Sequence, residues 1–178
     1  LCTSAVMKTV LPERASPVPA SGAFPLTEAQ QEIWLTSRLD ASAAPSFNES
    51  CALTFLGEMN RNAMGAALQQ LVARHEALRT TIDSSGEAQQ VAATAMPEFG
   101  FSDLAGMDER ARERQLDELV REEVRQPFDL SNAPLLRARL IRLEPQRHVM
   151  LLTAHHVICD GWSDDVMTRD LGALYSMA

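Results

Sequence analysis

Apolar residues recur every three or four positions in four stretches of the chain, and this spacing predicts four helices. The first lies within residues 24–39, the second follows Asn60, the third spans 108–126, and the fourth begins near Trp162 or Ser163. In each helix the recurring side chains share one face, which we expect to be buried. The four faces consist of Ala29, Ile33, Trp34 and Ser37; Met64, Leu68, Leu71 and Val72; Leu116, Leu119, Val120 and Val124; and Met167, Leu171, Leu174 and Tyr175.

Polar residues mark the starts of three of these helices. Thr27, followed by Gln30 three positions later, fits a capping box. Asn60 is a preferred residue type for capping the second helix. Asp164 and Asp165 fall at the positive end of the fourth, where carboxylates are favourable. The charged residues of the third helix outside its apolar face are expected to form a solvated surface.

Runs of apolar and β-branched residues between the helices predict five strands. Residues 149–152 are apolar throughout, which indicates a central strand covered on both faces. The order of the elements predicts a mixed sheet with helices packed against it, an α/β (α+β) sandwich. The strands are expected at 51–57, 78–83, 88–93, 135–143 and 147–154; a turn at 84–86 joins the second and third, and the last two form an antiparallel pair.

Residues 1–23 contain three prolines and many small residues, which is typical of an inter-domain linker. The alternative is an ordinary disordered N-terminus, and composition does not separate the two. We therefore expect the folded part to comprise residues 24–178.

Composition narrows the class of protein. Apolar residues make up 46% of the chain and charged residues 22%, as in ordinary soluble domains. No apolar run is long enough for a membrane span, and no signal peptide is recognisable. Cys2, Cys51 and Cys159 suggest neither a disulfide framework nor a zinc site, and they fit a reducing cytoplasm. A net charge of −8 without a basic cluster disfavours nucleic-acid binding.

The stretch HHVICDG, residues 155–161, follows the predicted central strand and carries the candidate chemistry. In an extended chain His155 and His156 point to opposite faces, so we expect one to face a cavity and the other the interior. Three interpretations remain open: a metal site formed with Asp160, a structural turn, and general acid–base catalysis. Asp160 would fix the loop, and Gly161 would permit a turn that a side chain would block.

Cys159 lies close enough to the histidines in sequence for a Cys–His pair to be considered. Its position within a buried turn favours a packing role. The chain contains no Gly-x-Ser-x-Gly nucleophile motif.

Four stretches together resemble the condensation domains of nonribosomal peptide synthetases, which belong to the chloramphenicol acetyltransferase-like superfamily. HHVICDGWS resembles their HHxxxDG motif, and the other three stretches occur in the family's order. The resemblance covers residues 24–178 and implies the N-terminal half of a two-lobed domain. The other three stretches are LTEAQQEIW, RHEALRT and QPFDLSNAPLLRARL.

The resemblance implies amide formation, in which an acceptor aminoacyl thioester attacks a donor acyl or peptidyl thioester. Both substrates are tethered to phosphopantetheine arms of donor and acceptor carrier proteins, and no cofactor is bound directly. His156 would be the catalytic residue, and His155 would orient the loop. Asp160 would be a structural residue that pairs with an arginine, a partner that this fragment would have lost with the missing half. Gly161 would let substrate approach the backbone.

The remaining motif residues are expected to be structural. Trp34 is interpreted as a core residue of the first helix. Arg74, His75 and Glu76 lie at a helix end, where basic groups complement the dipole. Arg79, in the strand that follows, is expected to form hydrogen bonds across the core.

Related activities remain possible. Epimerization domains share the histidine motif, and free CoA-dependent acyltransferases carry a shorter form of it. A non-catalytic docking module for carrier proteins is a further alternative.

Partners would be carrier proteins, neighbouring synthetase modules and the missing C-terminal half, with no nucleic acid or membrane. Without that half, the fragment should have little activity. FNESCAL, residues 47–53, resembles a form found in domains fed by polyketide donors.

Overall fold

A computed structural model describes residues 22–39 and 44–178. The linker predicted at residues 1–23 falls outside these residues except for its last two, and Ala23 already belongs to the first strand. The elements in chain order are β1 (Ala23–Pro25), α1 (Glu28–Leu39), the 3-10 helix η1 (Ala44–Phe47), β2 (Asn48–Leu56), α2 (Arg61–Arg74), the 3-10 helix η2 (Glu76–Arg79), β3 (Thr80–Ile82), β4 (Ala88–Val91), β5 (Glu98–Asp103), α3 (Glu109–Arg125), β6 (Leu136–Glu144), β7 (Arg147–His155) and α4 (Gly161–Ser176).

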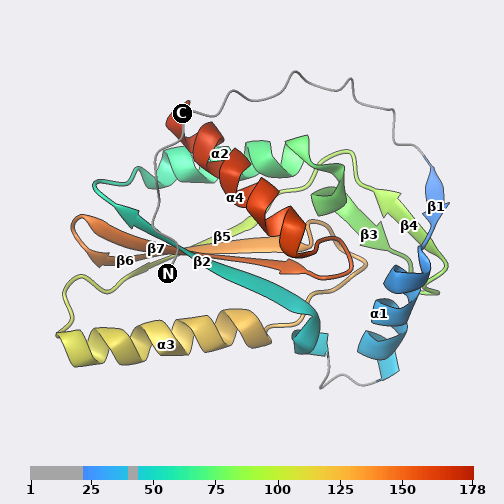
Figure 1. Cartoon of the computed structure of the whole chain (residues 1–178), viewed down its shortest axis with the longest axis horizontal. Coiled ribbons are helices and arrows are strands. Elements are labelled where there is room, and N and C mark those ends of the chain that lie inside the picture. The colour runs from blue at the N-terminus through green and yellow to red at the C-terminus, as the bar shows by residue number, and fades with distance from the viewer. Residues whose placement is uncertain (1–21, 40–43) are drawn as a thin grey trace.

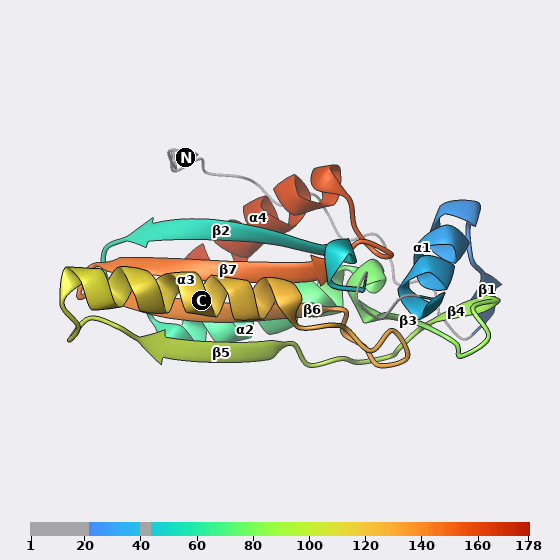
Figure 2. The same ribbon diagram turned by 90° about the horizontal axis from the view of Figure 1, so that it is seen from below.

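The main sheet has four strands in the order β2-β7-β6-β5 (Figures 1 and 2). Strand β7 is antiparallel to both of its neighbours, whereas β5 pairs parallel to β6. All residues of β7 after Arg147 are buried, which confirms the predicted central strand. The mixed sheet with packed helices confirms the α/β sandwich.

Helices α2 and α4 cover one face of this sheet, and α3 covers the other (Figure 1). The predicted faces of α2 and α4 are confirmed: every residue of both is buried except Tyr175, which is partly buried. In α3 only Leu119 of the predicted face is fully buried, and Val124 is 37% exposed. The core therefore consists of two apolar layers, one on each side of the sheet.

A second sheet, β1-β4-β3, lies beside α1 at one end of the molecule (Figure 1). Ile33 and Trp34 of α1 pack against a third apolar cluster at this end of the molecule, but α1 has no fully buried residue. Gly86, in the turn between β3 and β4, has a φ of +71°, and a Cβ there would collide with the Trp34 ring. The positive φ and the lack of room for a side chain therefore both require glycine here.

The predicted helix caps are present. The Thr27 hydroxyl accepts from the Gln30 N–H at 3.2 Å, and the Gln30 Oε1 accepts from the Thr27 N–H at 3.0 Å. The Asn60 Oδ1 accepts from the N–H groups of Asn62 and Ala63. These bonds satisfy backbone donors that a helix start leaves unpaired.

Some expectations are wrong in detail. Strand β2 begins at Asn48, three residues before the predicted start, and β1 and β5 were not predicted. Arg79 ends the η2 helix instead of lying in a strand. The charged surface predicted for α3 is interrupted by Glu123, which is buried and forms ion pairs with two arginines of β6. Periodicity identifies apolar faces but not a buried ion pair.

Candidate active site

The two histidines lie on opposite faces of the sheet, as predicted. His155 ends β7, and the backbone N–H of His156 donates to the Phe47 carbonyl at 2.7 Å, which prolongs the pairing of β2 with β7. Alternation then places His156 on the side of α2 and α4, together with Ala154 of their core. His155 points to the other side, where the Phe47 and Phe128 rings lie about 6.1 and 6.0 Å from its ring.

His155 is a buried, neutral imidazole. It is only 2% exposed, and its Nδ1 accepts the Val157 N–H at 3.2 Å, so its proton resides on Nε2. Burial, with His156 and Arg137 nearby, lowers the pKa of His155 to about 4. Its hydrogen bond ties the imidazole to the loop that follows the strand.

His156 is more accessible. Its side chain is 39% exposed, and its Nδ1 lies 3.2 Å from the Glu49 Oε1 of β2. The Nδ1 atom itself is enclosed and has no aligned hydrogen-bond partner. The half-open imidazole therefore turns one nitrogen toward a carboxylate and leaves the rest of its ring near the surface.

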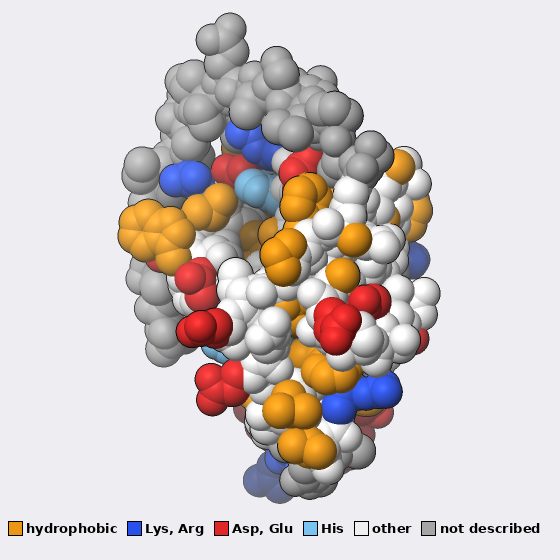
Figure 3. All heavy atoms as spheres, turned by 90° about the vertical axis from the view of Figure 1, so that its right-hand side faces the viewer, with side chains coloured by type: hydrophobic (Ala, Val, Ile, Leu, Met, Phe, Trp, Pro, Cys, Tyr) orange, Lys and Arg blue, Asp and Glu red, His pale blue; other side chains and the backbone are white. Residues whose placement is uncertain are grey.

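Further carboxylates surround His156. Asp164, in the first turn of α4, has its pKa raised by burial and then by Glu49, Asp165 and Asp160, with His156 opposing the shift. The start of a helix was expected to favour the charged form of the Asp164 carboxylate. Burial and the neighbouring negative charges outweigh that effect. Figure 3 looks onto the end of the molecule that carries α1 and the small sheet, and shows acidic, basic and hydrophobic side chains together on this surface.

Asp160 caps α4. Its Oδ1 accepts from the Ser163 N–H at 2.9 Å and from the Ser163 hydroxyl at 2.7 Å. These two bonds lower the pKa of Asp160. Within residues 22–39 and 44–178 no arginine is in ion-pair contact with it. The arginine partner expected from the resemblance is therefore not found in the described part of the chain.

Gly161 is the first residue of α4, and a Cβ there would meet no atom within 4 Å. Its φ is not positive, because the only glycines with positive φ among the described residues are Gly57 and Gly86. The expectation that a side chain would block this turn is therefore wrong.

Cys159 packs in the core. It is 7% exposed, and its thiol donates to the His155 carbonyl at 3.3 Å. Burial, with Asp164 the next contributor, raises the pKa of its thiol to about 12. A thiol with so high a pKa is a poor nucleophile, which favours packing over a Cys–His pair.

The RHEALRT stretch links α2 to α4 through Asp170, which sequence reasoning missed. The Asp170 Oδ2 lies 3.1 Å from the Arg74 Nε and 3.0 Å from the His75 Nε2. These basic groups thus contact a buried carboxylate, not only a helix end, while Glu76 is exposed. Arg79 donates to backbone carbonyls of Val72, Ala92 and Ala93, which matches the hydrogen bonding expected of it.

The LTEAQQEIW stretch contacts the histidine loop. The Gln30 Nε2 donates to the Val157 carbonyl at 3.2 Å and to the Gln89 Oε1 at 3.1 Å. Trp34 of the same stretch is half-buried against Gly86, with the Arg38 guanidinium 5.7 Å from its ring centre. This stretch therefore supports the loop from the side of the small sheet.

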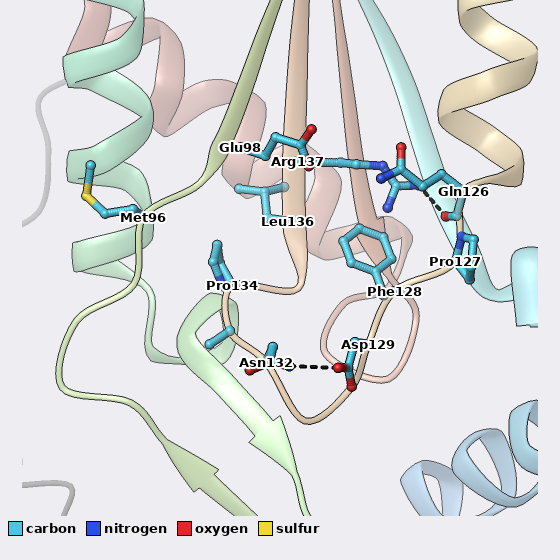
Figure 4. A pocket seen from close by; sticks show the side chains of 11 residues that line it. Met96, Glu98, Gln126, Pro127, Phe128, Asp129, Asn132, Pro134, Leu136 and Arg137 are labelled. Atoms are coloured by element: carbon cyan, nitrogen blue, oxygen red, sulfur yellow. Dashed lines mark hydrogen bonds between the residues drawn. The ribbon is translucent and has the colours of Figure 1, made fainter.

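Two cavities adjoin the loop of residues 126–134. One, of about 290 Å³, lies beside the start of β6, where Figure 4 shows Asn132 bonded to Asp129. The other, of about 190 Å³, has His155 and Trp34 in its wall. His156 lines neither of these two cavities, and its half-open side chain lies near the surface of the described residues.

The described residues offer neither a metal cluster nor a membrane span. They contain no group of three or more His, Cys, Asp or Glu residues placed to hold a metal ion. None of their helices is both long and apolar enough to cross a membrane.

Residues 20–178 match the family model described as "Condensation domain". The chain belongs to the condensation domain family. The fold described above is therefore that of part of a condensation domain.

Condensation domain proteins with similar sequences are large synthetases. Chondramide synthase of Chondromyces crocatus is 35% identical over 161 residues, which are 89% of this chain and 4% of the synthase. The dimodular nonribosomal peptide synthase of Bacillus subtilis is 37% identical over 157 residues, which are 86% of this chain and 6% of that synthase. The chain thus spans a small part of these relatives.

Solved condensation domains share the fold. The starter condensation domain of rhizomide synthetase superposes with a TM-score of 0.79 at 25% identity, over 88% of this chain and 39% of that one. The first condensation domain of CDA synthetase gives a TM-score of 0.75 at 24% identity, over 88% of this chain and 40% of that one.

Proposed function

We propose that this chain is part of a condensation domain that forms an amide bond between two carrier-bound thioesters. The proposal rests on one observation: the second histidine of HHVICDG stands half-open at the end of the central strand, with a carboxylate at its Nδ1. The whole domain includes more than these residues, since the chain covers 39% of a solved condensation domain chain.

In the proposed reaction, the amine of an acceptor aminoacyl thioester attacks the carbonyl of a donor thioester. A carbon–nitrogen bond forms and a carbon–sulfur bond breaks, so nitrogen loses a proton and the departing thiolate gains one. His156 is proposed to assist this transfer or to position the amine, since a neutral imidazole has one nitrogen that donates and one that accepts a proton. His155, the Asp160 cap and the bonds of Arg74, His75 and Arg79 hold the scaffold in place.

The substrates are proposed to arrive on phosphopantetheine arms of donor and acceptor carrier proteins. These carriers and neighbouring synthetase modules are the proposed partners, in nonribosomal peptide or hybrid peptide–polyketide synthesis. The names of the similar synthetases support this setting.

The proposal is tested by supplying a condensation domain that contains this chain with two loaded carrier proteins and measuring the amide product by mass spectrometry. Amide formation on the acceptor carrier is the expected result. Inversion of the α-carbon without an amide would favour epimerization instead. The 178-residue chain alone is expected to give no product, and robust turnover by it would contradict the proposed need for the rest of the domain.

A further inference from the structure

Glu49 occupies an unusual position on β2. The side of this strand that packs toward α2 and α4 presents Cys51, Leu53 and Phe55, all of which contact the core. Glu49 continues the same alternation and places a carboxylate at the end of an otherwise apolar row. A charge at such a position indicates a role other than packing.

The backbone fixes Glu49 next to His156. Glu49 pairs directly with Ala154 of β7, so His156, two residues farther on, is its diagonal neighbour on the same face. Diagonal neighbours across a sheet lie within reach of long side chains. The bond from the His156 N–H to the Phe47 carbonyl extends this register to His156.

We propose that Glu49 is a positioning residue for His156: its carboxylate accepts the proton of Nδ1 and leaves the lone pair of a neutral imidazole at Nε2. This inference rests on the proposed function, in which His156 needs an accepting nitrogen toward the substrate. A neutral imidazole has one donor and one acceptor nitrogen, so fixing the proton at Nδ1 decides which nitrogen is the base.

The observed contact supports this assignment. The two atoms are 3.2 Å apart, and the enclosed Nδ1 has no aligned partner, which is costly for a buried polar atom. The Glu49 side chain is 40% exposed and so has room to rotate into line. Catalytic hydrogen bonds are often poorly aligned before substrate binds.

The other groups around His156 are occupied differently. The Asp160 Oδ1 accepts two bonds from Ser163. Asp164 contributes charge, but no ion-pair contact joins it to His156 in the described residues, and His155 lies on the opposite face. Glu49 is therefore the carboxylate in contact with Nδ1.

The test uses nitrogen-15 NMR of the 178-residue chain at a pH where the His156 ring is neutral, because ring nitrogen shifts report the tautomer. The wild type is expected to show the proton on Nδ1, and Glu49→Ala is expected to move most of it to Nε2. Glu49→Gln should keep part of the Nδ1 form, because its amide oxygen still accepts. Asp164→Asn removes a nearby charge without touching Nδ1 and should keep the wild-type tautomer.

A wild type protonated mainly on Nε2, or a Glu49→Ala chain with an unchanged tautomer, would overturn the inference. In the whole condensation domain, Glu49→Ala should lower kcat about tenfold with KM unchanged, a fraction of the ~10²–10⁴-fold that a general base supplies. Glu49→Gln should recover part of that loss. The NMR result does not depend on turnover, so a failure of the proposed function is distinguishable from a failure of this inference.

Discussion

Replacing Glu123 by glutamine is expected to lower the free energy of unfolding by about 3 kcal/mol. The Glu123 Oε2 lies 3.1 Å from the Arg137 Nε, and its Oε1 lies 2.7 Å from the Arg139 Nε. The Glu123 and Arg137 side chains are each only 5% exposed. Burial lowers the pKa of Arg137, and the charge of Glu123 opposes that shift.

The magnitude follows from what remains after the change. Removing one partner of a buried ion pair costs about 3–5 kcal/mol, because the other charge stays buried. The low end applies here, since Arg137 still donates to the carbonyls of Glu123 and Gln126 and lies 4.1 Å from the centre of the Phe128 ring. Arg139 is 24% exposed and can be solvated instead.

Urea unfolding of the 178-residue chain, followed by circular dichroism, measures this loss. Glu122→Gln is the matched control, because Glu122 is the exposed neighbour in the same helix and should change stability by less than about 0.5 kcal/mol. A Glu123→Gln loss below about 1 kcal/mol would refute the assigned role of the buried carboxylate.

Three further predictions concern the histidine loop and its support. Gly86→Ala should cost more than Gly57→Ala in urea unfolding, because both have positive φ but only a Cβ at Gly86 would meet the Trp34 ring; equal losses would contradict this. Between pH 7 and pH 4 the unfolded chain should bind more protons at His155, whose pKa is about 4 when folded, so stability should fall by up to about 3 kcal/mol from this group. His155→Gln should flatten that slope, and an unchanged slope would show that other groups cause it. Asp160→Ala should lower the urea midpoint of unfolding through loss of the α4 cap, and an unchanged midpoint would contradict the capping role.

Much of the fold was predictable because its signals are local. The buried stripe of α2, the Asn60 cap and the paired strands β6 and β7 each follow from residue spacing or from a single polar residue. The small strand β1 carries no such signal, since it is three exposed residues stabilised by pairing with β4. Whether such a strand forms depends on a pairing partner that is distant in sequence.

The candidate site was predictable only in part. Alternation along β7 placed His155 and His156 on opposite faces, and the motif drew attention to them. Glu49 was missed because β2 was expected to begin at residue 51; extending the alternation by two residues would have put a carboxylate on the core-facing row. Asp170 and Glu123 were missed because their arginine partners come from other elements, which helix periodicity does not reveal.

The most direct test of the account compares wild-type and His156→Ala forms of a condensation domain that contains this chain, with the rate of amide formation measured between two loaded carrier proteins. Circular dichroism and urea unfolding would show that the variant keeps its fold, since His156 is half-exposed and outside the core. The account predicts a loss of at least about 10²-fold in turnover with unfolding unchanged. A folded His156→Ala domain with wild-type turnover would contradict it.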